Sequence, residues 1–354
     1  MRRRELLLGA LAASVGGLLS WPARAAGARK LVLYWAPGGW DPTMVLDPHF
    51  GDGVPADPGA EPASAGALQW ASSPERPSVD AFFQEHQART AILNGVEVGS
   101  MSHRQARKVL LTGSWDRSVP DFCTSVGAAT SLPIPVVLVS GPNLPGTQRH
   151  RVQPLSPTLS QTLAGEQDRA ALRSWLKQEG AELQGFEALL AHGQDLDPGD
   201  SWLEGVQAGV AALRDELSAC MVVQGTSTGF VGFDTHVGNT MNQSVAWEGA
   251  FQELTALAEA LGSQLDDTLV LAMSELGRAP QLTKAGGKEH WPVTSVLAFG
   301  AGVEPGVYGA TDARLWPIHG IQADGLAAAI VAHLGLSSEL TYPETEAFTD
   351  FLRS

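Results

Sequence analysis

Short apolar runs that alternate with helical patterns are the feature that most constrains the fold of this 354-residue chain. Most of the runs are continuous, as expected of strands that are covered on both faces. Strands that alternate with helices predict a mostly parallel sheet between two layers of helices, a three-layer α/β/α sandwich. The predicted strands are 31–36, 90–96, 134–139, 219–223, 268–273 and 294–299, and the predicted helices are 103–112, 168–191, 203–218, 244–265 and 322–334.

Two segments rich in Gly, Pro and Asp, 51–66 and 193–201, are predicted to be turns or surface loops. Hydrophobic residues make up 44% of the chain, which is enough to bury a large core. We therefore expect residues 26–354 to form a single domain.

The first 25 residues have the pattern of an export signal: a basic start, an apolar middle and a small-residue step that predicts cleavage after Ala25. Their apolar stretch, 6–19, is too short to span a bilayer of about 30 Å, and no later segment is longer, so we expect no membrane span. Arg3 and Arg4 before a leucine run resemble the twin-arginine signal, whose export machinery carries folded proteins. An ordinary secretion signal is the alternative, and both predict a periplasmic or secreted protein.

The charge of the chain excludes two classes of partner. Loss of four arginines and one glutamate with the signal changes the formal net charge from −15 to −18. Nucleic acids and anionic membranes need a basic stripe, which this sequence lacks. Cys123 and Cys220 lack the spacing of a metal site, and the sequence does not show whether they form a bridge.

Polar residues gather beside the predicted strands, where ligands bind in sheets of this type. The predicted metal ligands among them are Asp41, Asp234, His236, Glu275 and His290. Oxygen and imidazole donors without thiolates suit one or two divalent ions, and the histidines favour Zn or Mn over Mg or Ca. Asp234 and His236 lie two positions apart, so in an extended segment both side chains point to one face.

Several of the polar residues beside the predicted strands also have a structural interpretation. Asp41 follows two glycines and suits a turn, and Ser102 precedes a helical pattern and suits an N-cap. Glu275 and Arg278 suit a local ion pair. Their joint placement at successive strand ends favours a shared site.

Several motifs together resemble the bacterial family called domain of unknown function 1501, in the alkaline phosphatase and sulfatase-like superfamily. The motifs are GGWD, SMSHRQARKVLLTG, FDTH, SELGR, KEHW, FGAGVEPGVYGATD and DGLAAAIVAHLGL. The resemblance implies an alkaline phosphatase-like fold with a metal centre that hydrolyses phosphate or sulfate esters. It also implies metal-binding roles for Asp41, for the pair Asp234 and His236, for Glu275 and for His290.

The chain departs from the superfamily pattern at three places. Leu276 stands where a metal-binding histidine is usual, so one of two metal sites loses a ligand, and Glu289 replaces an aspartate. When Arg107 and the following Thr-Gly are matched to the sulfatase nucleophile segment, His103 falls on the nucleophile position. We therefore expect His103 to point into the site and Ser102 to cap the helix, although Ser102 is the alternative nucleophile.

Two functions from different classes fit these observations. The first is an exported hydrolase of a small-molecule or polysaccharide ester, in which Arg107 or Arg278 neutralises the oxygens of the ester. The second is a non-catalytic sulfatase-like scaffold or binding protein of the cell envelope, which the substitution at Leu276 favours. The retained carboxylates and histidines favour the hydrolase, because buried charges are costly unless something pairs with them.

Overall fold

The computed structural model of the chain describes residues 30–54, 57–130, 132–148, 152–166, 169–171, 173–174, 184–226, 232–336, 342 and 345–353. The predicted export signal, residues 1–25, lies outside the described residues, as does much of the predicted helix 168–191. Among the helices of the described ranges, none is long and apolar enough to cross a membrane.

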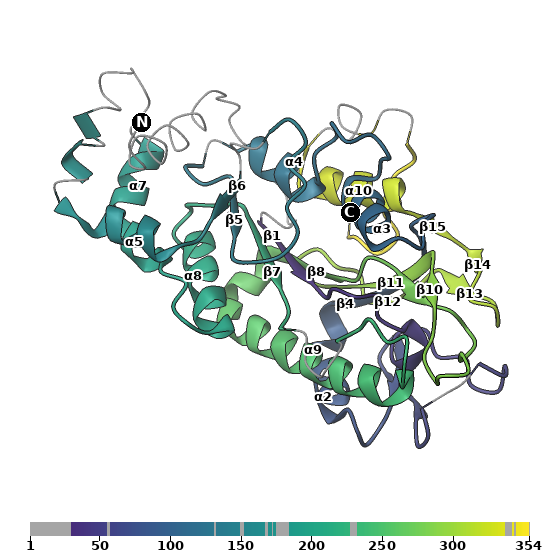
Figure 1. Cartoon of the computed structure of the whole chain (residues 1–354). Helices are drawn as coiled ribbons and strands as arrows, with labels where there is room; N and C mark the ends of the chain where they lie inside the picture. The colour runs from purple at the N-terminus through teal and green to yellow at the C-terminus, as the bar shows by residue number, and fades with distance from the viewer. Residues whose placement is uncertain are drawn as a thin grey trace.

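A nine-stranded mixed sheet forms the centre of the fold (Figure 1). Its strands in spatial order are β12 (Gly306–Tyr308), β4 (Thr90–Glu97), β11 (Val293–Gly300), β8 (Thr268–Met273), β1 (Lys30–Trp35), β7 (Cys220–Gln224), β5 (Val136–Leu138) and β6 (Val152–Pro154), and β15 (Ile321–Gln322) also pairs with β4. Strand β11 runs antiparallel to both of its neighbours, β4 and β8. The other pairs in this sheet are parallel.

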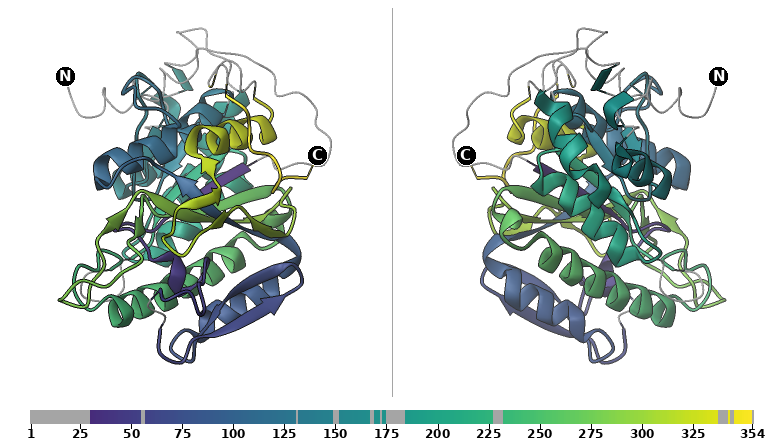
Figure 2. Two further views of the ribbon diagram at one scale, coloured as in Figure 1. Left: turned by 90° about the vertical axis from the view of Figure 1, so that its right-hand side faces the viewer. Right: turned by 90° about the vertical axis from the view of Figure 1, so that its left-hand side faces the viewer.

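Helices cover both faces of the sheet, so the predicted three-layer sandwich is confirmed (Figures 1 and 2). One face packs against α3 (His103–Thr112), α4 (Phe122–Ala128) and α10 (Ala323–His333), and the other against α2 (Pro77–His86), α8 (Trp202–Arg214) and α9 (Asn239–Leu261). Strand β1 shows why both faces are apolar. Leu31 and Leu33 point into the first core and Val32 and Tyr34 into the second, because successive side chains of a strand alternate.

Smaller elements surround the sheet. Helices α5 (Pro157–Ala164) and α7 (Gln184–His192) build a third apolar cluster with α8 beside β5. The short 3₁₀ helices are Pro42–Met44, Gln87–Arg89, Gly193–Leu196 and Gly262–Asp266. Three two-stranded ribbons consist of β2 (Glu61–Ala65) with β3 (Leu68–Ser72), β9 (Gly277–Arg278) with β10 (His290–Trp291), and β13 (Ala310–Thr311) with β14 (Pro317–His319).

The predicted elements agree with the structure where the apolar pattern is strong. All six predicted strands are present, and the predicted helix 103–112 has the bounds of α3. The prediction of a loop over 51–66 is wrong at its end, because residues 61–65 form β2. This strand is mostly exposed and pairs only with β3, so it carries no apolar pattern of its own.

The parallel strands place the predicted site residues at one edge of the sheet. Strands β1, β7 and β8 run in one direction, and β4 shares it because β11 is antiparallel to both β4 and β8. Their carboxyl ends therefore meet at the same edge. The polar segments that follow these strands converge there.

Candidate metal centre

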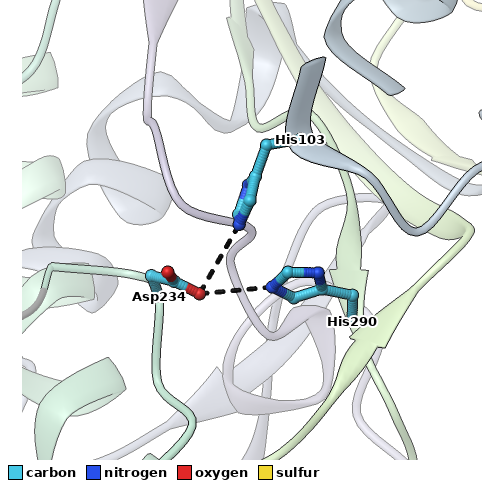
Figure 3. Close-up of side chains that lie close together, drawn as sticks. All are labelled: His103, Asp234 and His290. Carbon is cyan, nitrogen blue, oxygen red and sulfur yellow. Dashed lines mark hydrogen bonds and ion pairs between the residues drawn. The ribbon is translucent and has the colours of Figure 1, made fainter. Parts of the chain in front are cut away.

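Three histidines surround one carboxylate oxygen at this edge of the sheet. Asp234 Oδ1 lies 3.2 Å from His236 Nε2, 3.3 Å from His290 Nε2 and 3.6 Å from His103 Nε2. His236 Nε2 and His290 Nε2 are 3.0 Å apart. Figure 3 shows the rings of His103 and His290 directed at Asp234 from different elements. His103, Asp234 and His290 form a group whose ligand atoms lie within 4.8 Å of one another.

The four side chains come from three segments of the chain. His103 is the first residue of α3, after the loop that follows β4, and His290 belongs to β10. Asp234 and His236 lie between β7 and α9. Gly287 allows the segment before His290 to approach them, because a Cβ at this position would lie 1.9 Å from the carbonyl carbon of His236.

The second ring nitrogen of each histidine faces an oxygen that can only accept a hydrogen bond. His103 Nδ1 lies 2.8 Å from Glu275 Oε1, and His290 Nδ1 lies 2.7 Å from the carbonyl oxygen of Met101. His236 Nδ1 lies 3.3 Å from Glu289 Oε2. These partners place the proton of each neutral ring on Nδ1, which leaves a lone pair on every Nε2.

The cluster therefore fits a cation. Two Nε2 lone pairs at 3.0 Å repel each other unless a proton or a metal ion lies between them. Ligand atoms in a tetrahedral zinc site are about 3.3 Å apart, given zinc–ligand distances of about 2.0–2.1 Å. The contacts around Asp234 Oδ1 span 3.2–3.6 Å, close to that spacing. Histidines whose outer nitrogens are held by carboxylate or carbonyl oxygens are also typical of metal ligands.

Glu275 supports the cluster through His103 rather than belonging to it. Its Oε1 accepts hydrogen bonds from His103 and from the Gly38 amide, 3.0 Å away. Its buried Oε2 has no hydrogen-bond partner among the described residues. The hydrogen bond to Glu275 raises the pKa of His103, although burial lowers it. Because Glu275 Oε1 contacts the outer nitrogen of His103, Glu275 supports a ligand in this structure, and its own role as a ligand stays a prediction.

Arg278 holds the loop after β1 in place. Its guanidinium is fully buried and donates to the carbonyl oxygens of Gly38, Gly39 and Lys288 and to Asp234 Oδ1, 2.7 Å away. Burial raises the pKa of Asp234, but the hydrogen bond and charge of Arg278 outweigh it, so this pKa is lowered. Arg278 therefore stabilises the ionised form of Asp234. In this structure the guanidinium contacts protein oxygens, and its predicted contact with the oxygens of an ester stays a prediction.

Asp41 lies in a separate, fully buried ion pair. Its Oδ2 is 2.7 Å from Lys288 Nζ and accepts a hydrogen bond from Asn239, and its Oδ1 accepts two from Thr43. Asp41 is also the N-cap of the 3₁₀ helix Pro42–Met44. In this structure an ammonium group satisfies the carboxylate, which fits the structural interpretation of Asp41 as a turn residue, and its role as a metal ligand stays a prediction.

The predicted catalytic segment separates into two parts. His103 points into the cluster, whereas Ser102 is exposed at the N-cap position of α3. The expectation that Ser102 caps the helix is only half right, because its side chain accepts no hydrogen bond from the first turn. Arg107 is half-buried and lies one turn along α3 from His103.

Two important contacts have no signal in the sequence. The sequence does not predict the ion pair of Lys288 with Asp41, because 247 positions separate the two residues and each lies in a short loop without a motif that links them. The carbonyl oxygen of Met101 that orients His290 is a backbone group, so no residue type marks it. Glu289 does have a signal, because it directly precedes His290 in KEHW.

A second group of possible ligands, His192, Asp195 and Asp215, lies on the surface at the end of α7. Asp215 already receives two hydrogen bonds from Arg214, at 2.8 and 2.9 Å. This carboxylate is therefore neutralised without an ion. We assign no function to the group.

Comparison with known proteins identifies one family. Residues 206–347 match the model of a family described as a protein of unknown function (DUF1501). The resemblance that FDTH, SELGR and KEHW indicate is thereby confirmed. The DUF1501 match includes Asp234, His236 and His290, whereas His103 lies before it.

Several solved structures are similar to the chain at low sequence identity. One is a protein in the alkaline phosphatase superfamily from Vibrio parahaemolyticus, with 9% identity, a TM-score of 0.44 and coverage of 95% of this chain and 76% of that one. The C-terminal periplasmic domain of EcEptC from Escherichia coli has 10% identity, a TM-score of 0.48 and coverage of 94% and 93%. The lipoteichoic acid synthase LtaP from Listeria monocytogenes has 10% identity, a TM-score of 0.48 and coverage of 93% and 78%. No curated protein matches the sequence.

Proposed function

We propose that the chain is a metal-dependent hydrolase of a phosphate or sulfate ester. His103, Asp234, His236 and His290 hold one divalent ion, for which three imidazoles and one carboxylate favour zinc or manganese. The observation that carries the proposal is the 3.0 Å contact between His236 Nε2 and His290 Nε2, with both outer nitrogens facing acceptors. This arrangement needs a positive charge at its centre.

The proposal assigns one ion rather than two. Leu276, at the position where the superfamily pattern has a metal-binding histidine, is fully buried in the apolar core. Asp41, the other residue that the pattern gives to a metal, is neutralised by Lys288. The two positions that would contribute to a second metal site are thus occupied by an apolar side chain, Leu276, and by a carboxylate that is already paired with Lys288.

The surroundings of the cluster suit hydrolysis. Side chains of His236 and Asp234 are 43% and 45% exposed, so an ester can approach from their side. A bound divalent ion supplies Lewis-acid chemistry, which stabilises negative charge on an ester oxygen and promotes ionisation of water. Glu275 keeps the proton on His103 Nδ1, so that His103 Nε2 faces the centre as an acceptor. Arg278 keeps Asp234 ionised from the buried side.

We propose water as the attacking group. The four side chains of the cluster carry no hydroxyl group, and Ser102 is exposed at the start of α3. The oxygen of water would bond to phosphorus or sulfur, the ester bond would break, and the alcohol would leave with a proton. Export by the twin-arginine route remains part of the proposal, on the basis of Arg3 and Arg4.

The test uses 4-nitrophenyl phosphate and 4-nitrophenyl sulfate with the zinc- or manganese-loaded full chain. We expect hydrolysis of at least one substrate, its loss in His290→Gln, and its retention in Ser102→Ala. His319→Gln is the matched control, because His319 is exposed on β14 and is not one of the four clustered side chains. Metal binding without hydrolysis of either substrate would contradict the enzyme and favour the alternative, a non-catalytic scaffold or binding protein.

A further inference from the structure

A buried polar network lies on the inner side of the segments that carry the clustered histidines. It comes from the loop after β1, the segment between β7 and α9, the start of α9 and the loop between β9 and β10. The network therefore joins parts of the chain that are distant in sequence and meet at the carboxyl edge of the sheet. Its five members, each at most 1% exposed, are Asp41, Thr235, Asn239, Gln243 and Lys288.

Thr235 stands between two of the proposed metal ligands in the sequence. The side chains of Asp234 and His236 are 45% and 43% exposed, whereas Thr235 is fully buried. The two ligands thus lie on the solvent side of this segment and the threonine hydroxyl on the inner side. The hydroxyl donates to Asn239 Oδ1, 2.5 Å away, and accepts from Gln243 Nε2, 3.1 Å away.

The network connects this segment to the one that carries His290. Lys288 lies two residues before His290, and its amide donates to the carbonyl oxygen of Thr235, 3.0 Å away. The Lys288 ammonium group is 2.7 Å from Asp41 Oδ2, which also accepts from Asn239 Nδ2 at 2.8 Å. One connection thus runs through the backbone and a second runs through side chains. Together they set the spacing of the two segments.

Groups with a single hydrogen-bonding role set the direction of these bonds. The Asp41 carboxylate only accepts, so Asn239 turns its NH₂ group to Asp41 and its oxygen to Thr235. The Asp41 amide only donates, so Gln243 turns its oxygen to this amide, at 2.9 Å, and its NH₂ group to Thr235. The Thr235 hydroxyl completes both sequences with its one hydrogen. A network whose members are all satisfied in this way is rigid.

We propose that Thr235 is a positioning residue of the metal centre, and that its hydroxyl acts through the network and not on the ion. This role rests on the metal-dependent function proposed above. His236 Nε2 and His290 Nε2 come from the two segments that the network joins, and they are 3.0 Å apart. A metal ion binds well only when its ligand distances lie within about 0.2 Å of their preferred values. A change in the spacing of the segments therefore weakens binding.

Thr235→Val removes the hydroxyl and keeps the branched shape of the side chain. Asn239 Oδ1 then loses its donor, and Gln243 Nε2 loses one of its acceptors. Because a buried polar group without a partner is costly, the two amides shift to find new ones. We expect the zinc affinity of the folded protein to fall about 10-fold, at the lower end of the effect of outer partners of metal ligands. Thr235→Ser keeps the hydroxyl and should bind zinc as the wild type does.

Ser218→Ala is the matched control. Ser218 is also fully buried, and its hydroxyl lies 3.2 Å from the carbonyl oxygen of Pro135 and 2.9 Å from that of Cys220. It precedes β7 and so lies at the amino end of this strand, at the edge of the sheet opposite the cluster. Loss of this hydroxyl should lower the free energy of unfolding and leave zinc affinity unchanged.

The test measures zinc affinity by competition with a chromogenic chelator, and stability by urea denaturation, on the full chain. Weaker zinc binding is expected in Thr235→Val, with one zinc per chain still bound at saturation, and not in Thr235→Ser or Ser218→Ala. Asn239→Ala removes the other partner of the same hydrogen bond and should weaken binding in the same way, so the test does not depend on the folding of one variant.

Three results would overturn the positioning role. Folded Thr235→Val or Asn239→Ala that binds zinc as tightly as Ser218→Ala would overturn it and leave the metal centre intact. An equal loss in Thr235→Ser and Thr235→Val would show that the hydroxyl is not the group that acts. Wild-type protein that binds no zinc would overturn the metal centre and the positioning role with it.

Discussion

His236 Nε2 lies 3.0 Å from His290 Nε2, and the outer nitrogens of both rings face oxygens that only accept hydrogen bonds. Two neutral imidazoles in this orientation repel each other, so the contact needs a proton or a metal ion. Asp234 Oδ1 lies within 3.3 Å of both nitrogens and adds negative charge at the same point. We propose that a metal ion lies at this point, where all three atoms would bind it.

The first prediction concerns His236. We expect His236→Gln to weaken zinc binding by more than the about 10–100-fold typical of losing an outer partner, because it removes a donor atom. His319→Gln, which changes an exposed histidine outside the cluster, should bind as the wild type does. Competition with a chromogenic zinc chelator measures both constants. Equal losses in the two variants would point to a nonspecific surface effect.

The second prediction separates Glu275 from the ligands. Glu275→Gln keeps an acceptor for His103 Nδ1 but removes the charge, so we expect zinc affinity to fall about 10–100-fold with one ion still bound at saturation. If Glu275 is instead a ligand, the loss should match that of His236→Gln. The same chelator competition, together with the stoichiometry at saturation, distinguishes these outcomes.

The third prediction concerns the buried ion pair of Asp41 and Lys288. Lys288→Met leaves the Asp41 charge buried and uncompensated, which should cost about 3–5 kcal/mol in the free energy of unfolding. The double variant Asp41→Asn with Lys288→Met should lose much less than the sum of the single variants. Urea denaturation measures all three.

An exposed ion pair serves as the control for the buried pair of Asp41 and Lys288. Arg89 lies 2.8 Å from Asp266 on the surface, and Arg89→Met should cost about 1 kcal/mol or less. A cost for Lys288→Met as small as that of Arg89→Met would show that the buried pair does not need its ammonium.

The fourth prediction concerns the pH dependence of stability at His49. The carboxylate of Asp47, 3.7 Å from His49 Nε2, raises the pKa of this imidazole, although burial lowers it, and Asp52 adds to the increase. Because the folded pKa is above the unfolded value of about 6.5, the contribution to stability is complete below about pH 6.5 and is lost as pH rises through the folded pKa. We expect His49→Gln to destabilise the protein more at about pH 5.5 than at about pH 8.5. Thermal unfolding at the two pH values checks this, and an equal effect at both would contradict it.

The sequence predicts the sheet well because buried strands have strong apolar patterns. Strand β8 has the predicted bounds, 268–273, and all six of its residues are buried. Strands β9 and β10 have two residues each and depend on each other for pairing, so no local pattern marks them. Strand β2 pairs with β3 and is largely exposed, so no local apolar pattern marks it either.

The candidate site is predicted only in part because ligand and partner roles depend on angles and not on residue type. Asp234, His236 and His290 were placed together from their positions beside strands, and they do converge. Asp41 has the same residue type and a similar position, yet its carboxylate faces Lys288. The loop between β9 and β10 brings Lys288 to Asp41, and no single motif of the sequence encodes the path of this loop.

The most direct test of the metal centre is the metal content of the full chain by inductively coupled plasma mass spectrometry, after incubation with zinc and removal of unbound ions. The account predicts one zinc per wild-type chain, one in His319→Gln and none in the double variant His236→Gln with His290→Gln. Folding of each variant is checked by circular dichroism. Wild-type protein that retains no more zinc than the folded double variant would contradict the metal centre.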